Sequence, residues 1–246
     1  MPKTLPVYRP QLATAFRNHC RTILVIMSSF PLATAKTELR NKHQQARQLA
    51  AHNRDTWRKS NAALSHNVAE FLKSLRCPGQ PLRVAGYVPL DDEPGAGTLL
   101  NALESHTDEL WLPICQPGFR LSWSQYDGPD SLAVRNPRLP IPEPRGEGIS
   151  STECLPTLDL IVLPALAIDH TGYRLGKGAG FYDRAIAEAW TACSSNTSSS
   201  AVTSSKAMPE LIGVVFSTEV RPFVPHDERD CAVNKIITEI GITTIS

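Results

Sequence analysis

The strongest constraint on the fold is the segment from Leu158 to Trp190, whose character changes twice. It starts as an unbroken apolar run, LDLIVLPALAI, continues as a glycine-rich loop, DHTGYRLGKGAG, and ends in a helical pattern, FYDRAIAEAW. A continuous apolar run is typical of a strand that is buried on both faces of a parallel sheet. The order of strand, glycine loop and helix therefore predicts an α/β domain in which the loop lies at the carboxyl end of a sheet strand.

The rest of the chain repeats this alternation of helical and strand patterns. Helices are expected from Thr34 and over residues 64–75, 98–106 and 180–192, and strands in LRVAGYVPL, ELWLPI, FRLSWSQY, LIGVVFS and NKIITEI. FRLSWSQY alternates with period two, which predicts a half-exposed strand, and residues 137–148, dense in proline and glycine, predict a long loop. Together these patterns predict one three-layer α/β domain over residues 34–246, with a mostly parallel central sheet. A serine-rich insertion at residues 193–207 is expected to be disordered.

The region before Glu38 contains no acidic residue and carries Lys3, Arg9, Arg17 and Arg21 among its basic residues. That composition resembles a transit peptide. The alternative is a start codon assigned too early, since Met27 precedes the first helical pattern, and this alternative is slightly favoured. On either view residues 1–33 are expected to lie outside the fold. The predicted location is the cytoplasm, or the mitochondrion if the extension is a transit peptide.

Composition excludes several classes of function. The net charge is +1, so no bulk attraction to nucleic acid or to an anionic membrane is expected, and no apolar run is long enough to span a bilayer. The six cysteines are scattered without a CxxC pair, which argues against a zinc cluster or a disulfide framework and favours a reducing compartment. We therefore expect small-molecule substrates, no nucleic acid or membrane partner, and a monomer.

The first helical segment carries two stripes. Leu39, Ala46, Ala50 and Trp57 recur with the helical period and predict the packed face. A second, basic stripe contains Lys36, Arg40, His43 and Arg47, and lies about 70° away around the helix. This basic stripe is either a solvated face or one that looks into a cleft.

The glycine loop has the properties of a phosphate site. Gly172, Gly176, Gly178 and Gly180 let backbone N–H groups approach an anion, the following helix adds a partial positive charge, and Arg174 and Lys177 add full ones. A purely structural turn is the alternative. The loop fits neither the P-loop pattern nor the dinucleotide GxGxxG pattern. Asp183, in the first helical turn, is either a favourable partner of the helix dipole or a ligand of a nucleotide-bound Mg²⁺.

Three segments together resemble the 5-formyltetrahydrofolate cyclo-ligase family, over about Lys36 to Glu239. LPALAIDHTGYRLGKGAGFYDRAI matches its specific glycine-loop signature, AKTELR its N-terminal helix, and GVVFSTEVRPFVPHDERDCAVNKIITE its C-terminal block. YVPLDDEPGAGTLL is similar to the segment that carries the family's substrate glutamate. The resemblance implies a fold of the sugar-phosphate isomerase and CoA-transferase type, and ATP- and Mg²⁺-dependent conversion of 5-formyltetrahydrofolate to 5,10-methenyltetrahydrofolate, with release of ADP and phosphate.

The resemblance also implies roles for individual residues. ATP would be held by Lys36, Arg40, Arg174, Leu175, Gly176, Lys177, Gly178, Ala179, Gly180, Phe181 and Tyr182. The folate substrate would contact Val88, Glu93 and the stretch Lys177, Gly178, Ala179, Gly180 and Phe181, and the metal would bind Asp183 and Asp227. Arg174, Lys177 and Glu93 are the expected catalytic residues, with Glu93 orienting the folate. Because a pterin ring needs an apolar and partly aromatic slot, Trp123 on the alternating strand is also expected in the pocket wall, and Trp111 in the core.

The sequence departs from the family pattern at two positions of the expected site, without loss of a charged group there, and the serine-rich insertion and the long N-terminus are peripheral departures. Phe181 replaces a frequent tyrosine, which keeps an aromatic ring but loses a hydroxyl, and Ala179 replaces a frequent glycine or lysine. Glu143, in IPEPRG, stays without an assigned role. Two alternatives remain at this point: another sugar-phosphate or CoA-binding enzyme of the same fold, or a folate-binding module without catalytic activity.

Overall fold

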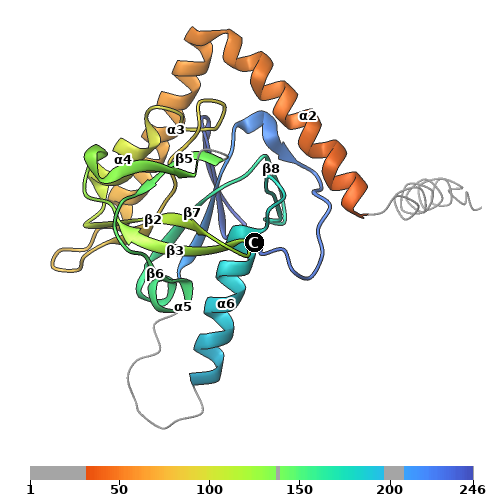
Figure 1. Cartoon of the computed structure of the whole chain (residues 1–246). Helices are drawn as coiled ribbons and strands as arrows, with labels where there is room; N and C mark the ends of the chain where they lie inside the picture. The colour runs from red at the N-terminus through yellow and green to blue at the C-terminus, as the bar shows by residue number, and fades with distance from the viewer. Residues whose placement is uncertain (1–31, 137–138, 197–207, 246) are drawn as a thin grey trace, which may run out of the picture.

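A computed structural model of the chain describes residues 32–136, 139–196 and 208–245. Within these ranges the centre is an eight-stranded sheet in the order β13-β12-β10-β7-β1-β2-β3-β6 (Figure 1). Its strands are β1 (Arg83–Ala85), β2 (Glu109–Gln116), β3 (Arg120–Gln125), β6 (Ile149–Ser150), β7 (Leu160–Pro164), β10 (Glu210–Val214), β12 (Lys235–Thr238) and β13 (Gly241–Thr244). The five inner strands are parallel, and β13, β3 and β6 join antiparallel at the two edges. The predicted mostly parallel sheet is confirmed.

Helices cover both faces of the sheet. They are α2 (Leu32–His52), α3 (Arg54–Leu75), α4 (Leu99–His106), α5 (Ser151–Cys154) and α6 (Phe181–Asn196), with 3₁₀ turns η1 (Pro129–Ser131), η2 (Leu155–Thr157) and η3 (Ser217–Glu219). Figure 1 shows α3 and α4 on one side of the sheet and α5 and α6 on the other. The predicted three-layer α/β architecture is therefore confirmed.

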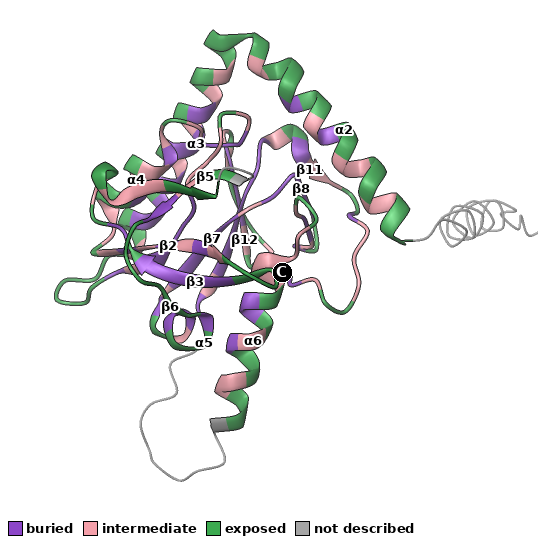
Figure 2. Ribbon diagram, viewed as in Figure 1, coloured by how far each residue is buried: buried purple, intermediate pink, exposed green. Residues whose placement is uncertain are grey.

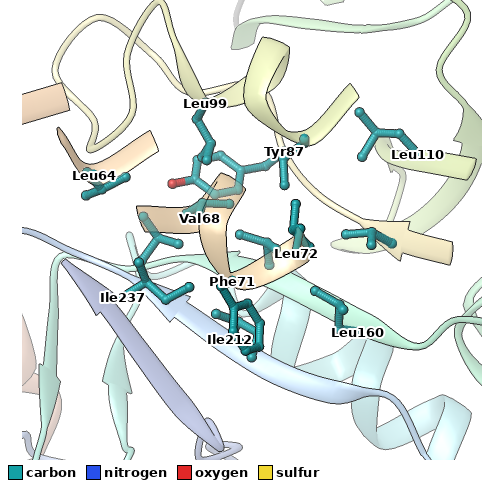
Figure 3. Close-up of a cluster of buried hydrophobic side chains, with 14 of the residues drawn as sticks. Leu64, Val68, Phe71, Leu72, Tyr87, Leu99, Leu110, Leu160, Ile212 and Ile237 are labelled. Atoms are coloured by element: carbon teal, nitrogen blue, oxygen red, sulfur yellow. The ribbon is translucent and has the colours of Figure 1, made fainter. Parts of the chain in front are cut away.

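Strand β7 explains why both faces need cover. Leu160 and Val162 belong to the core that faces α3 and α4, whereas Ile161 and Leu163 belong to the core that faces α5 and α6. Figure 3 shows the first of these cores, in which side chains of α3 lie against side chains from the sheet strands. All four β7 side chains are at most 1% exposed, so removing any one would cost on the order of 2–4 kcal/mol.

The run predicted as a single strand divides into two. The chain leaves the main sheet at Pro164 and forms β8 (Ala167–Asp169), which pairs with β9 (Arg174–Leu175) and β11 (Val220–Arg221) in a small separate sheet. The pairing of β8 with β9 fixes both ends of the turn at residues 170–173, which contains Gly172. The start of the glycine loop is therefore fixed by backbone pairing rather than left as a free turn.

The expected packing of the first helix is wrong. Ala46 and Ala50 are exposed, Leu39 is half-buried, and the buried residues of α2 are His43 and Arg47 from the basic stripe. Asn53 ends the helical run, because its side chain accepts a hydrogen bond from the Thr56 N–H and caps α3. Figure 2 shows α2 exposed along most of its length. The basic face turns inward because Glu219 neutralises Arg47 there, a partner that helical periodicity cannot reveal.

Two expectations about the region after β2 are also wrong. Strand β3 is not half-exposed, because Leu121, Ser122, Trp123 and Ser124 are all buried. The predicted long loop at 137–148 contains β5 (Leu139–Pro144), which pairs with β4 (Leu132–Asn136) as a two-stranded ribbon. The chain after β5 covers the serine face of β3, since a Cβ at Gly148 would lie 2.3 Å from Ser122 Oγ. Three alternating prolines are tolerated in β5 because it is an edge strand.

Several predictions concern residues that lie wholly or partly outside the described ranges. Residues 1–31 of the predicted extension lie outside, as do residues 197–207 of the predicted insertion, while residues 193–196 form the end of α6. Among the described cysteines, Cys77, Cys115, Cys154, Cys193 and Cys231 are all free thiols. No helix in the described ranges is long and apolar enough to cross a membrane.

Candidate active site

A cavity of about 320 Å³ opens beyond the carboxyl ends of β1 and β7. Val88 lines it just after β1, Pro164 lines it at the end of β7, and Ile141 lines it from β5. Glycine-loop residues 176–180 form another part of its wall. The site therefore lies where ligands bind in open parallel sheets, and its volume is in the range of small-molecule sites.

Backbone conformation explains the glycines of the loop. Gly178 has a φ of +109°, which side chains disfavour, and a Cβ there would lie 3.4 Å from Arg40 Cζ. Gly172 has a φ of +89°, and a Cβ there would lie 2.5 Å from the Val233 carbonyl oxygen. Gly172 therefore seats the loop on the C-terminal segment, whereas Gly178 makes room for a cationic side chain from α2.

The structure brings α2 and the glycine loop together. Arg40 donates from Nε to the Gly176 carbonyl oxygen at 2.9 Å, and Lys36 forms a 2.6 Å ion pair with Asp230. The next residue, Cys231, accepts a hydrogen bond from Arg174 through its carbonyl oxygen at 2.6 Å. Lys36 and Arg174 therefore meet at residues 230 and 231, whereas Arg40 contacts the glycine loop itself at Gly176.

Arg174 and Asp183 form a partly buried pair at the start of α6. Arg174 Nη2 lies 2.8 Å from Asp183 Oδ1, and the same oxygen accepts a hydrogen bond from the Cys231 N–H. Arg174 is 5% exposed, so its guanidinium is held in place by protein partners and lines the cavity from a fixed position. This placement gives Arg174 a structural role in addition to the phosphate contact expected from sequence. Replacing it would leave the Asp183 carboxylate without its cation.

Lys177 and Glu93, two of the expected catalytic residues, contact each other. Lys177 Nζ lies 2.8 Å from Glu93 Oε1, and Glu93 Oε2 accepts a hydrogen bond from the Leu90 N–H. Glu93 is 7% exposed, whereas the Lys177 side chain is 41% exposed. The carboxylate is thus fixed at the cavity wall, and the ammonium group can move when a ligand enters.

Arg47 is a cavity residue to which sequence reasoning assigned no ligand. It makes two hydrogen bonds to Glu219, from Nε at 2.6 Å and from Nη2 at 2.8 Å, and a third to the Ala165 carbonyl oxygen. Burial opposes the charged form of Arg47, but the Glu219 contacts outweigh it and raise the Arg47 pKa. The pair ties α2 to η3 beneath the cavity. The basic stripe at Arg40 and Lys36 is thereby held against the loop.

The two expected metal ligands lie near one C-terminal segment. Asp183 uses Oδ1 for both of its hydrogen bonds, so Oδ2 is available to a ligand. Asp227 is held by Arg229, whose hydrogen bonds lower the Asp227 pKa, and the Arg229 side chain is 84% exposed. Within the described residues no group of three His, Cys, Asp or Glu side chains could hold a metal. A metal carried by nucleotide phosphates requires only one or two protein carboxylates, and this donor set fits that type.

Several expected site residues do not contact the cavity through their side chains. Trp123 is a correction: it is 1% exposed, donates from Nε1 to Ser151 Oγ, and lies behind Tyr182 with a 6.3 Å centroid separation. The covered strand β3 places it in the core. Leu175 is 1% exposed and packs in a small separate core, so only its backbone remains for a nucleotide. Trp111, expected in the core, is half-buried and packs against its edge.

Most of the remaining expected residues line the cavity, but Lys36, Arg40 and Asp227 are not part of its wall. Val88, Glu93, Arg174, Asp183 and the stretch 176–182 are all in its wall. Sequence reasoning missed Glu143 and Cys115, which face the cavity from β5 and β2. The paired prolines around Glu143 were the available signal, since they suggested a fixed backbone without indicating what it faces.

The chain is similar to several known proteins. The sequence model described as the 5-formyltetrahydrofolate cyclo-ligase family matches residues 33–239. The 5-formyltetrahydrofolate cyclo-ligase of Mycolicibacterium smegmatis is 30% identical over 173 residues, which cover 68% of this chain and 78% of that protein. The solution structure of 5,10-methenyltetrahydrofolate synthetase from Aquifex aeolicus aligns with a TM-score of 0.61 at 27% identity, covering 86% of this chain and 93% of that one. A synthetase from Mycoplasma pneumoniae, at 16% identity, has the same fold, with a TM-score of 0.57 over 83% of this chain and 98% of that one.

Proposed function

Because this chain is an enzyme of the 5-formyltetrahydrofolate cyclo-ligase family, we propose that it converts 5-formyltetrahydrofolate and ATP to 5,10-methenyltetrahydrofolate, ADP and phosphate. The observation that carries the proposal is the junction of α2 with the glycine loop, where Arg40 donates to Gly176. This junction adjoins an apolar cavity that fits a pterin ring. A phosphate grip beside an apolar slot is the arrangement that this two-substrate reaction needs.

The reaction must activate the formyl oxygen, which is a poor leaving group. The formyl oxygen attacks the γ-phosphorus of ATP, and the bond between that phosphorus and the β–γ bridging oxygen breaks to release ADP. N10 then attacks the activated formyl carbon, the carbon–oxygen bond breaks, and phosphate departs as N10 loses its proton. The product is the 5,10-methenyl ring. Such phosphoryl transfer depends mainly on positioning and charge neutralisation by the protein.

The cations around the loop are suited to that task. Lys36 and Arg40 come from α2, Arg174 from β9 and Lys177 from the loop that follows β9. We expect these four cations to bind the triphosphate together with the loop's backbone N–H groups. Arg174 is pre-oriented by Asp183 and would require little reorganisation when charge develops. Lys177 would exchange part of its contact with Glu93 for a phosphate oxygen.

The folate would occupy the apolar part of the cavity. Tyr87, Val88 and Phe181 lie in its wall. Glu93 lies in the same wall, in contact with Lys177. In this position the Glu93 carboxylate would orient the folate near N5 and N10. Asp183, with its available Oδ2, and Asp227 would hold Mg²⁺, which would supply further neutralisation of phosphate charge.

The test is a cyclisation assay with purified protein. Racemic 5-formyltetrahydrofolate and ATP should give the near-ultraviolet absorbance of the methenyl product, with one ADP formed for each product molecule. Omitting ATP should abolish the signal. Binding of 5-formyltetrahydrofolate without ADP release would instead assign a folate-binding role without catalysis. An absence of binding to either substrate would reject the proposal.

A further inference from the structure

Glu143 is a buried carboxylate in the cavity wall for which the described residues provide no cation. It is 5% exposed and lines the cavity from β5. In the described part of the chain its partners are the Cys115 N–H, which donates to Oε1 at 2.9 Å, and the Cys115 thiol, whose pKa is raised by burial and by its hydrogen bond with Glu143. The other buried acid of the cavity wall, Glu93, has Lys177 as a partner. A buried carboxylate without a cation is costly, so its retention beside a cavity calls for a ligand.

The backbone around Glu143 holds it in this position. Pro142 and Pro144 flank it and fix the local φ angles, and Glu143 pairs with Ala133 across the β4–β5 ribbon. The hydrogen bond to Cys115 fastens this ribbon to β2. The carboxylate is thus supported from both sides, as a specific recognition group must be.

Capping a strand edge explains only part of this arrangement. Strand β1 pairs with β2 as far as Trp111, and beyond it the β1-facing edge of β2 is open. On that edge Pro113 has no N–H, and Cys115 has one, which Glu143 caps. One N–H requires one acceptor, which a neutral glutamine would also provide. A carboxylate offers about four acceptor positions, so about half of its capacity remains for a ligand in the cavity beside the Cys115 N–H and thiol.

We propose that Glu143 recognises the pyrimidinone edge of the pterin, by accepting hydrogen bonds from N3–H and from the 2-amino group. This inference rests on the proposed function, because it takes the substrate to be a reduced folate. The two pterin donors are adjacent and parallel, which matches the two oxygens of one carboxylate as a guanidinium does. Apolar neighbours such as Ile141 and Leu121 exclude water and make the contact selective. Glu143 is thus a specificity residue for the pterin end of the substrate.

Binding measurements with two ligands test the assignment. Calorimetric titrations compare 5-formyltetrahydrofolate with its 2-desamino analogue, using the wild-type chain, Glu143→Gln and the control Glu147→Gln on an exposed position nearby. The glutamine can still cap Cys115, so the ribbon stays in place. Wild type and Glu147→Gln should bind the analogue about 10- to 100-fold more weakly than the natural substrate. Glu143→Gln should bind the natural substrate about 10- to 100-fold more weakly than wild type does. Its Kd values for the natural substrate and the analogue should differ by less than about threefold, and its ATP Kd should be unchanged.

The two failures are distinguishable. A wild-type protein that cyclises the substrate, with a Glu143→Gln variant that still discriminates as wild type does, overturns the assignment of Glu143 and leaves the proposed function intact. A wild-type protein that binds neither folate overturns both. The ratio of two Kd values within one variant does not depend on the folded fraction, so partial unfolding of Glu143→Gln cannot imitate the expected result.

Discussion

Arg40 Nε donates a hydrogen bond to the Gly176 carbonyl oxygen at 2.9 Å, across 136 residues of sequence. The same guanidinium lies over Gly178, where a Cβ would be 3.4 Å from Arg40 Cζ. A helix near the start of the chain and a loop that follows β9 thus make one surface. The proposed grip on ATP depends on this contact, because it places a cation of α2 beside the backbone of the glycine loop.

Lys177→Gln should reduce the catalytic efficiency while leaving the fold intact. The Lys177 side chain is 41% exposed, a glutamine can still donate to Glu93 through its amide, and Glu93 keeps its hydrogen bond from Leu90, so the buried carboxylate stays hydrogen-bonded. The loss of one cation aimed at developing charge should lower kcat/KM by about 10²- to 10³-fold. Steady-state kinetics would be compared with Lys73→Gln, which loses only an exposed pair with Glu70. Equal kinetics for the two variants would remove Lys177 from the site.

Asp183→Asn should raise the Mg²⁺ concentration needed for half-maximal activity by about tenfold or more. The asparagine oxygen can still accept from Arg174 and Cys231, so the start of α6 should be unchanged. A Mg²⁺ titration at fixed ATP measures the shift. The control is Asp55→Asn, which changes an exposed side chain at the start of α3. If the two titration curves coincide, Asp183 serves only to position Arg174.

Arg47→Met should destabilise the protein by about 3–5 kcal/mol, because it leaves Glu219 buried without its cation. The control Arg58→Gln removes an exposed pair and should cost at most about 0.5 kcal/mol. Urea unfolding provides both values. The double variant Arg47→Met, Glu219→Leu should recover much of the loss. A single variant within about 1 kcal/mol of wild type would show that this pair does not hold α2 in place.

His43 should make the stability depend on pH in the mildly acidic range. Burial is the main cause that lowers the His43 pKa to about 4, and the nearby Arg221, Arg47 and Lys42 lower it further. Between pH 6.5 and 4 the unfolded chain binds this proton more readily than the folded one. Stability from His43 is therefore complete above pH 6.5 and is lost as the pH falls toward 4.

The comparison with His43→Gln isolates this effect. Across that pH window the wild type should lose about 1–2 kcal/mol more than the variant. Chemical unfolding at several pH values measures the difference, and contributions from other groups cancel between the two proteins. Parallel pH profiles for the two would contradict the assignment.

Local patterns predicted the parts of the fold that depend on local chemistry. The apolar run LDLIVLPALAI predicts a doubly buried strand, and its first part, β7, has a core on each face, whereas its last residues form the separate strand β8. The glycine loop was placed between a strand and a helix, where the structure has it. The cavity residues Val88 and Glu93 came from resemblance alone, because their neighbourhood has no distinctive periodicity.

The errors come from contacts between distant segments. The inward face of α2 depends on Glu219, which lies 172 residues away, so the apolar stripe misled the packing prediction. Trp123 lies in the core because the chain after β5 covers one face of β3 and α6 covers the other. The sequence FRLSWSQY alone does not indicate either of these contacts. Glu143 had no assigned role because the proposal for it depends on its burial and on the absence of a cationic partner among the described residues, which only coordinates reveal.

The most direct test of the central claim is the ATP affinity of Arg40→Gln beside that of Arg58→Gln. Equilibrium titration with a non-hydrolysable ATP analogue should show a Kd raised about 10- to 100-fold for Arg40→Gln, and a wild-type Kd for the exposed control. Folate affinity should change by less than about threefold in either variant. A wild-type ATP Kd for Arg40→Gln would contradict the joint grip of α2 and the glycine loop on the triphosphate.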